Sequence, residues 1–247
     1  MSNDTRKLFD CSAGVADIAR LALPQRCELC VASSGRELLC RACDADLPHL
    51  AAPCPTCALP ATTGAACGAC LAHPPVWSHA IAALVYTFPV DHLLQQLKYG
   101  GRLALADWAG GKLSTAVRAS LASRSSHERP GRVVALPLSA SRQRERGFNQ
   151  AREIAAGVAR AVGVPLVSPL ARIAETTPQT ALAWSERARN VRGAFAVVAD
   201  VRGARIALVD DVMTTGATLA EAARTLIQAG AADVECWVVA RTLRDAE

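Results

Sequence analysis

The segment from Arg205 to Thr218 restricts the possible folds of this chain more than any other. It begins with apolar residues 206–209, whose β-branched content favours a strand buried on both faces of a parallel sheet. Two acids stand where that strand is expected to end, and five small residues follow shortly after: Asp210 and Asp211, then Thr214, Thr215, Gly216, Ala217 and Thr218. Apolar residues then recur with a helical period. The segment therefore predicts a strand, a tight polar loop and a helix, as in an α/β fold.

This loop has the chemistry of a sugar-phosphate site. Free N–H groups in the first turn of a helix attract an anion, and the Thr hydroxyls add donors for the same phosphate. Carboxylates repel phosphate, so Asp210 and Asp211 suit ribose hydroxyls or a cation held beside the phosphates. A strand–turn–helix with a capping Thr and two solvated Asp is the alternative. The paired acids joined to Thr-Thr-Gly-x-Thr favour a ribose 5-phosphate, and the sequence has neither a Walker loop nor Gly-x-Gly-x-x-Gly.

Cysteines are concentrated before residue 71, where eight of the ten form four Cys-x-x-Cys pairs. The pairs are Cys27/Cys30, Cys40/Cys43, Cys54/Cys57 and Cys67/Cys70. Two pairs can complete a tetrahedral site of four thiolates, which favours Zn²⁺, and nine-residue spacers make sequential pairing the simplest arrangement. Interleaved pairing, a disulfide framework, a redox Cys-x-x-Cys and a [4Fe–4S] cluster are the alternatives. We expect two structural zinc ions, which would supply much of this segment's folding energy.

The pattern divides the chain into three parts. We expect an N-terminal helical segment over residues 1–23, a double zinc-ribbon module over 24–73 and an α/β domain over 78–245, after a linker at 71–79 that contains two consecutive prolines. The N-terminus lacks the features of a signal peptide. No uncharged apolar run reaches the roughly 18 residues that a membrane span needs, so no insertion into a membrane is expected.

Within the α/β domain, apolar runs predict strands over 80–88, 132–136, 194–198, 206–209 and 234–239. Helices are expected over 91–97, 103–122 and 150–162, with a weak point at Gly110-Gly111 in the second. The long polar, Arg-rich stretch formed by residues 176–179 and 185–195 is a candidate lid over the ligand crevice.

A basic loop over 138–150 follows the strand at 132–136 and should face the loop at 210–218, because ligands bind at the carboxyl edge of such sheets. Its Arg142, Arg144 and Arg146 suit pyrophosphate or a nucleic-acid backbone, and a solvated basic loop is the alternative. The excess positive charge of the chain is localised here, since residues 141–205 hold eleven Arg against five acids.

The motifs together resemble those of the ComF family. They are the four Cys pairs, Lys-Tyr-Gly-Gly, Arg-Gly-Phe-Asn-Gln, Arg-Asn-Val-Arg-Gly-Ala-Phe and Val-Asp-Asp-Val-x-Thr-Thr-Gly-x-Thr, in this order over residues 21–243. The last is similar to the phosphoribosyl-diphosphate signature of type I phosphoribosyltransferases. The resemblance implies a phosphoribosyltransferase-like domain with a mostly parallel sheet flanked by helices, preceded by a zinc ribbon, in a cytoplasmic protein linked to natural competence. Val31 and Ala58 depart from the pattern, because ribbons often have Gly at these positions.

Two classes of function are compatible with these residues. In the first, an enzyme binds Mg²⁺-phosphoribosyl diphosphate, with the 5-phosphate on residues 214–218, the ribose on Asp210 and Asp211, and the pyrophosphate on Leu138, Ser139, Arg142 and Lys98. The two acids would be its catalytic residues. In the second, the same fold binds single-stranded DNA within the DNA-uptake machinery, through Arg142, Arg144 and Arg146 and stacking on Phe148 or Trp184.

Overall fold

The computed structural model describes residues 25–61, 64–174 and 191–243. The chain forms two compact units, Met1–Leu47 and Pro48–Glu247. This division lies inside the stretch predicted as one double-ribbon module, so the two groups of cysteines belong to different units. The predicted helical segment over 1–23, Trp184 and the first part of the candidate lid lie outside the described residues.

The described part of the smaller unit is a small ribbon. Strands β1 (Gln25–Arg26) and β2 (Ser33–Gly35) pair in antiparallel fashion. A short helix follows, α2 (Arg41–Ala45), which begins directly after Cys40. The cysteines of this unit therefore lie in the turn after β1 and in the first turn of α2.

The larger unit is built on a five-stranded sheet with the order β3-β9-β8-β4-β5. All four pairings within it are parallel. The strands are β3 (His79–Val85), β4 (Arg132–Ala135), β5 (Leu166–Val167), β8 (Arg205–Met213) and β9 (Asp233–Arg241). The predicted α/β class with a mostly parallel sheet is confirmed. The strand predicted over 194–198 is β7 (Phe195–Val197), which pairs with β6 (Leu170–Arg172) outside this sheet.

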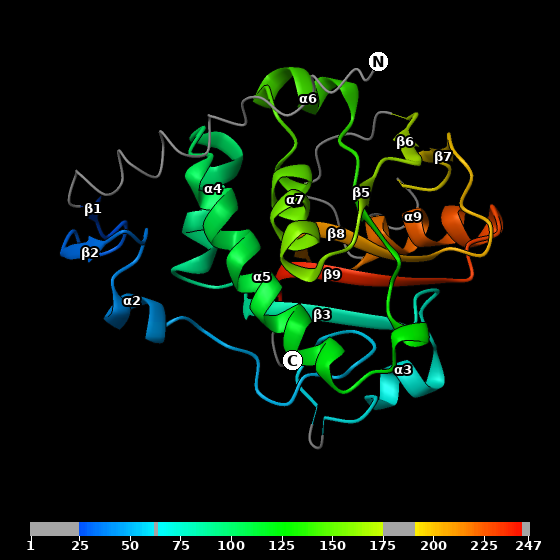
Figure 1. Cartoon of the computed structure of the whole chain (residues 1–247), viewed down its shortest axis with the longest axis horizontal. Coiled ribbons are helices and arrows are strands. Elements are labelled where there is room, and N and C mark those ends of the chain that lie inside the picture. The colour runs from blue at the N-terminus through cyan, green and yellow to red at the C-terminus, as the bar shows by residue number, and fades with distance from the viewer. Residues whose placement is uncertain (1–24, 62–63, 175–190, 244–247) are drawn as a thin grey trace, which may run out of the picture. The chain divides into compact units, whose positions relative to one another are not determined.

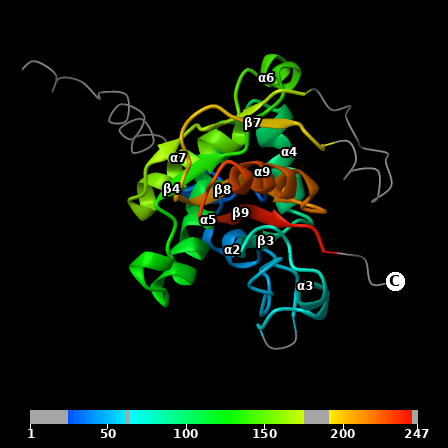
Figure 2. The same ribbon diagram turned by 90° about the vertical axis from the view of Figure 1, so that its right-hand side faces the viewer.

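Helices cover both faces of the sheet (Figures 1 and 2). On one face, α5 (Ala104–Ala122) and α7 (Gln150–Val162) pack against the strands, and α4 (Val90–Tyr99) packs against α5. On the other face lies α9 (Ala217–Gln228), whose Leu219 and Leu226 share a core cluster with Ile206 and Leu208 of β8. The expected helices are therefore present, and side chains of β8 alternate between two buried layers.

The Gly110-Gly111 pair does not weaken α5, which runs continuously from Ala104–Ala122. A Cβ atom on Gly110 would lie 3.3 Å from the carbonyl oxygen of Ile154 and 3.7 Å from the Cα of Gly157, both in α7. The missing side chain therefore allows α5 and α7 to approach closely, and this packing compensates the low helix propensity of glycine.

Three sequence expectations differ from the structure, the first two at the carboxyl edge of the sheet and the third in the linker before β3. The strand before the phosphate loop continues to Met213, so Asp210 and Asp211 lie inside β8 rather than after it. The segment predicted as a basic loop contains a helix, α6 (Ala140–Arg146). Part of the predicted linker is buried, because Trp77 is only 7% exposed and belongs to the core. Pairing with β9 extends β8 beyond its apolar run. In the linker, the two consecutive prolines had predicted only a connection between the two parts of the chain.

The described part of the larger unit also contains two short helices, α3 (Gly68–Ala72) and the 3-10 helix η1 (Ser126–Glu128). Among the described residues, no helix combines the length and the hydropathy that crossing a membrane requires.

Candidate functional site

Residues 214–218, called the phosphate loop below, connect β8 to α9. Gly216 is the N-cap of α9 and has φ +79°, a left-handed conformation that glycine adopts without strain. Thr214 is exposed, and Thr215 and Thr218 are half-buried. The hydroxyl oxygen of Thr215 accepts a hydrogen bond from the N–H of Ala217 at 3.1 Å. The loop thus presents hydroxyls and the N-terminal end of a twelve-residue helix, as an anion site requires.

The two acids that precede the loop have different surroundings. Asp211 is 4% exposed and forms an ion pair with Lys98, the last-turn lysine of α4. Asp210 is half-buried and accepts a hydrogen bond from the N–H of Asp211 at 2.8 Å. The two carboxyl groups also interact with each other, and the charge of Lys98 acts on both. The structure therefore unites Lys98 with both acids, through the ion pair with Asp211 and at longer range with Asp210.

The charges of these groups are strongly coupled. Burial and the negative charge of Asp211 raise the pKa of Asp210 well above its usual value. Burial acts the same way on Asp211, but the neighbouring ammonium of Lys98 holds its pKa below the usual value. The pKa of Lys98 is raised, because the charge of Asp211 outweighs the effect of burial. Two carboxylates thus share one lysine, so the site would gain from an added cation.

The basic residues of α6 are not equivalent, because positions 142, 144 and 146 point in different directions on a helix. Ser139 is buried and caps α6 by accepting from the N–H of Arg142. Arg146 donates to Gln150 at 3.0 Å, and its guanidinium carbon lies 4.9 Å from the centroid of the Tyr99 ring. Arg144 is exposed. Arg146, which was predicted to bind a ligand together with Arg142 and Arg144, therefore already makes contacts within the protein.

Asn149 holds the end of β4 to the start of α7, a role that residue patterns alone did not indicate. Its side-chain oxygen accepts from the N–H groups of Ala151 and Arg152, and its side-chain nitrogen donates to the carbonyl of Leu136 at 3.1 Å. The Asn in Arg-Gly-Phe-Asn-Gln is a helix-capping residue, so the helix-start signal could have identified it. It positions the chain around Ser139 and Arg142.

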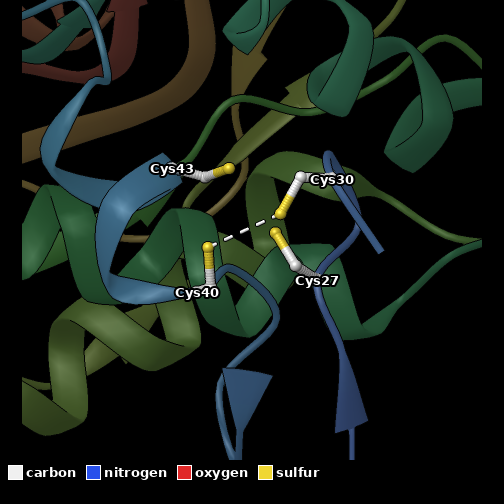
Figure 3. A group of neighbouring side chains, drawn as sticks. All are labelled: Cys27, Cys30, Cys40 and Cys43. Atoms are coloured by element: carbon white, nitrogen blue, oxygen red, sulfur yellow. Dashed lines mark hydrogen bonds between the residues drawn. The ribbon is translucent and has the colours of Figure 1, made fainter. Parts of the chain in front are cut away.

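The eight paired cysteines form two sequential groups. The first group is Cys27, Cys30, Cys40 and Cys43, and the second group is Cys54, Cys57, Cys67 and Cys70. In each group the four sulfurs lie within 4.8 Å of one another, and in the first they converge on one point (Figure 3). The Sγ atoms of Cys30 and Cys40, and those of Cys57 and Cys67, are 3.7 Å apart. A tetrahedral zinc site with Zn–S of about 2.3 Å places sulfurs about 3.8 Å apart, so both groups fit Zn²⁺.

This geometry decides between the pairing alternatives. Sequential pairing is confirmed, whereas interleaved pairing does not occur. All eight cysteines are free thiols, so a disulfide framework is excluded. The second pair of each group begins a short helix, with Cys40 and Cys67 as N-caps.

The turns after Cys27 and Cys54 are zinc knuckles, here called the first knuckle (residues 27–31) and the second knuckle (residues 54–58). Val31 has φ +63° and Ala58 has φ +56°, the left-handed conformation for which ribbons usually have Gly. The chain keeps the knuckle geometry in spite of these residues, at a cost of about 1–2 kcal/mol each. The departure from the Gly pattern therefore does not change which residues are ligands.

The thiols in each group influence one another. Burial opposes ionisation of Cys27 and Cys54, but nearby backbone N–H groups lower the pKa of each to about 6. Hydrogen bonds with the sulfurs of Cys30 and Cys40 raise the pKa of Cys43, and burial together with Cys57 and Cys67 raises that of Cys70. Four thiolates at this spacing need a cation to ionise together, which is the chemistry of a metal site.

Comparison with known proteins places the chain in a family. Residues 139–247 match the Phosphoribosyl transferase domain and residues 18–71 match the Double zinc ribbon domain. DNA utilization protein YhgH of Salmonella typhimurium is 36% identical over 208 residues, which cover 83% of this chain and 91% of that protein. Competence protein F of Haemophilus influenzae is 30% identical over 181 residues, covering 71% and 78%. The chain belongs to the ComF family.

A solved structure is also similar to this ComF-family chain. The glutamine phosphoribosylpyrophosphate amidotransferase of B. subtilis is 21% identical, with a TM-score of 0.35, over 54% of this chain and 25% of that enzyme. The fold assignment rests on the parallel sheet, the two Cys groups and the two matched domains. The chain has the type I phosphoribosyltransferase fold and a double zinc ribbon.

Proposed function

We propose that this ComF-family chain binds phosphoribosyl diphosphate with Mg²⁺ at the carboxyl edge of its sheet. The observation that carries the proposal is the pair Asp210 and Asp211 in β8, directly before a helix-capping loop of Thr and Gly. The phosphate loop would bind the 5-phosphate through N–H groups and hydroxyls. The carboxylates would accept hydrogen bonds from the ribose hydroxyls. Parallel strands bring both groups to one edge of the sheet.

The acids also fit a magnesium ion. Mg²⁺ prefers one or two carboxylates together with phosphate oxygens and water, and Asp210 offers a partly buried carboxylate that shares a single lysine with Asp211. A bound ion there would supply charge neutralisation to the pyrophosphate. Lys98 keeps Asp211 ionised at the same time, because their ion pair lowers the pKa of that acid. Both acids would then accept from the diol.

We further propose that the site transfers the phosphoribosyl group to an acceptor. Leu138, Ser139 and Arg142 follow β4, whose end pairs beside Val209 of β8, so they lie near the expected pyrophosphate position. As the C–O bond to pyrophosphate breaks, the leaving group takes the electron pair and the ribose gains oxocarbenium character. Arg142 and Lys98 would stabilise the leaving anion, and the acceptor would form the new bond at the anomeric carbon.

Calorimetry with phosphoribosyl diphosphate tests this function. We expect Mg²⁺-dependent binding that weakens roughly 10- to 100-fold in Asp210→Asn, because a charge-assisted hydrogen bond contributes about 1.5–3 kcal/mol. Asp200→Asn is the matched control, since Asp200 is an exposed acid paired with Arg202 away from the loop. No affinity of the wild-type protein at millimolar ligand would refute the proposal.

Single-stranded DNA is the second candidate ligand. It is favoured by the names of the relatives, DNA utilization protein and Competence protein F, and by the exposed Arg144 on α6. In this case the chain would act in the cytoplasm with other DNA-uptake proteins. Phosphate contacts by Arg142, Arg144 and Arg146 would release counterions, so affinity should fall steeply as salt rises.

The salt dependence locates the DNA site. Replacing the three arginines of α6 by Ala should flatten the slope of affinity against salt by about two to three charges. The control is Arg36→Ala/Arg41→Ala, which removes two exposed charges from the smaller unit. An unchanged slope in the α6 variant, together with a reduced slope in the control, would place the DNA site on the first ribbon. Binding of DNA without any affinity for phosphoribosyl diphosphate would make this the function.

A further inference from the structure

The second knuckle is attached to the phosphoribosyltransferase body through three successive backbone carbonyls, those of residues 55–57. The first accepts from the N–H of Ala80 in β3 at 2.9 Å. The second accepts from the indole Nε1 of Trp77 at 2.6 Å, and the third accepts from Nε of Arg241 at 2.9 Å. These carbonyls belong to the turn that presents Cys54 and Cys57, so their positions depend on the geometry of the second Cys group.

Arg241 joins this knuckle to the start of the phosphate loop. Its side chain is 4% exposed, and it stands at the end of β9, paired with Met213 of β8. Its Nη1 donates to the carbonyl of Met213 at 2.8 Å, to the carbonyl of Thr214 and to that of Thr242 at 3.1 Å. A single guanidinium therefore bonds to the knuckle with one nitrogen and to the loop with another.

Trp77 makes a second connection. Its nitrogen bonds to the knuckle, and its ring lies against Gly216, where an added Cβ would be 3.0 Å from the ring atom Cη2. Gly216 is the N-cap of α9 and the middle residue of the phosphate loop. Tryptophan and arginine thus each contact the knuckle at one end and the loop at the other, and both are buried.

We propose that Trp77 and Arg241 are positioning residues that couple the second zinc site to the phosphate loop. When the four thiolates of the second Cys group hold their ion, the carbonyls of residues 55–57 hold both side chains, and these hold the loop. When the ion is lost, the knuckle relaxes and the loop loses its ordered conformation. The effect on phosphoribosyl diphosphate affinity rests on the proposed function, whereas the effect on loop order does not.

Hydrogen exchange of the loop amides tests the coupling without any ligand. In Cys57→Ser we expect the amides of residues 214–218 to exchange at least about tenfold faster than in the wild-type protein. The matched control is Cys30→Ser, which occupies the same position in the first group. It should lose one zinc and leave the loop unchanged. Equal loop exchange in both variants and in the wild-type protein would overturn the proposal.

Two conservative variants separate positioning from unfolding. Trp77→Phe keeps a ring against Gly216 but removes the donor to the knuckle, and Arg241→Lys keeps the charge but cannot bridge four carbonyls. Both should retain two zinc ions per chain by elemental analysis while the loop amides exchange several-fold faster. Full zinc content with wild-type loop exchange in both variants would show that the contacts are only packing.

Coupling must also act in the opposite direction, because linkage between two binding sites is reciprocal. Saturating Mg²⁺-phosphoribosyl diphosphate should slow the transfer of one of the two zinc ions to a chelator, and Arg241→Lys should abolish this protection. Faster loop exchange without ligand affinity would contradict the proposed function alone. Ligand affinity without any effect of Cys57→Ser on the loop would contradict the coupling alone.

Discussion

Asp210 and Asp211 are adjacent in sequence, but they have different surroundings in β8. Asp211 lies in a buried ion pair with Lys98, whereas Asp210 is affected by the charge of Lys98 only at longer range. The burial of a charge is tolerated only where a partner compensates it. The acids should therefore respond differently to the same change from Asp to Asn.

Asp211→Asn should destabilise the protein. The substitution leaves the ammonium of Lys98 without its partner in a site where its side chain is 17% exposed. Breaking a buried pair costs about 3–5 kcal/mol, and the partial exposure of Lys98 places the expected loss at the lower end. Urea unfolding should show this loss, and Lys98→Met/Asp211→Asn should recover most of it. A double variant as unstable as the single one would contradict the ion-pair explanation.

Asp210→Asn should instead stabilise the protein while it weakens ligand binding. The pKa of Asp210 is raised in the folded state, so ionisation of this carboxyl destabilises the fold. The wild-type protein is free of this cost only at low pH, where the carboxyl is protonated. We expect a gain of roughly 1 kcal/mol at pH 7.5, the size seen when a functional charge is removed. The gain should vanish at acid pH, where the wild-type carboxyl is already protonated. Unfolding at several pH values measures it, and a gain that grows on acidification would show the opposite sign.

At the scale of elements, the contact between α5 and α7 depends on a pair of glycines that face each other. Gly110 of α5 meets Ile154 and Gly157 of α7, while its neighbour Gly111 is exposed and has open space where a Cβ would stand. The two adjacent positions share one helix and one residue type, so they form a matched experiment.

Gly110→Ala should destabilise the protein by about 1–3 kcal/mol, because the new methyl group forces α5 away from α7. Gly111→Ala should stabilise it by about 0.5–1 kcal/mol, because alanine favours the helix and meets nothing. Chemical denaturation of both variants measures the contrast. A stabilising Gly110→Ala would show that the two helices can separate without loss.

The sequence predicted the elements that have a clear period but not those that depend on distant partners. Residues 206–209, the helix at 150–162 and the four Cys pairs were identified from their pattern. The continuation of β8 through Asp210 to Met213 was missed, because pairing with β9 supplies it. The same is true of Trp77 and Arg241, whose hydrogen-bond partners lie 21 and 184 residues away in sequence.

For the whole molecule, loss of metal from the two Cys groups should affect the stability of the larger unit unequally. Ala58 of the second knuckle and Trp77 belong to the hydrophobic core of the larger unit, so this ribbon is part of the phosphoribosyltransferase body. The first group lies in the smaller unit. Metal loss at the second site should therefore destabilise the larger unit.

Cys54→Ser and Cys27→Ser test this difference at matched buried positions, since both cysteines begin a knuckle. Each variant should lose one of two zinc ions by elemental analysis. Cys54→Ser should also lower the midpoint of the main thermal transition by about 2–8 °C, the shift that follows from 1–2 kcal/mol in a unit of this size. Cys27→Ser should leave that transition unchanged. Equal midpoints would show that the second ribbon is thermally independent.

The strand order also has a consequence for how the protein is made. β9 lies between β8 and β3 in the sheet, yet it begins at Asp233, long after β3 ends at Val85. At 5–20 residues per second, the ribosome needs roughly 7 to 30 s to synthesise the chain between these points. During that interval β3 has no neighbour in the sheet, and its open edge is available to other nascent chains. Production of this protein should therefore depend on chaperones that shield an incomplete sheet until β9 emerges.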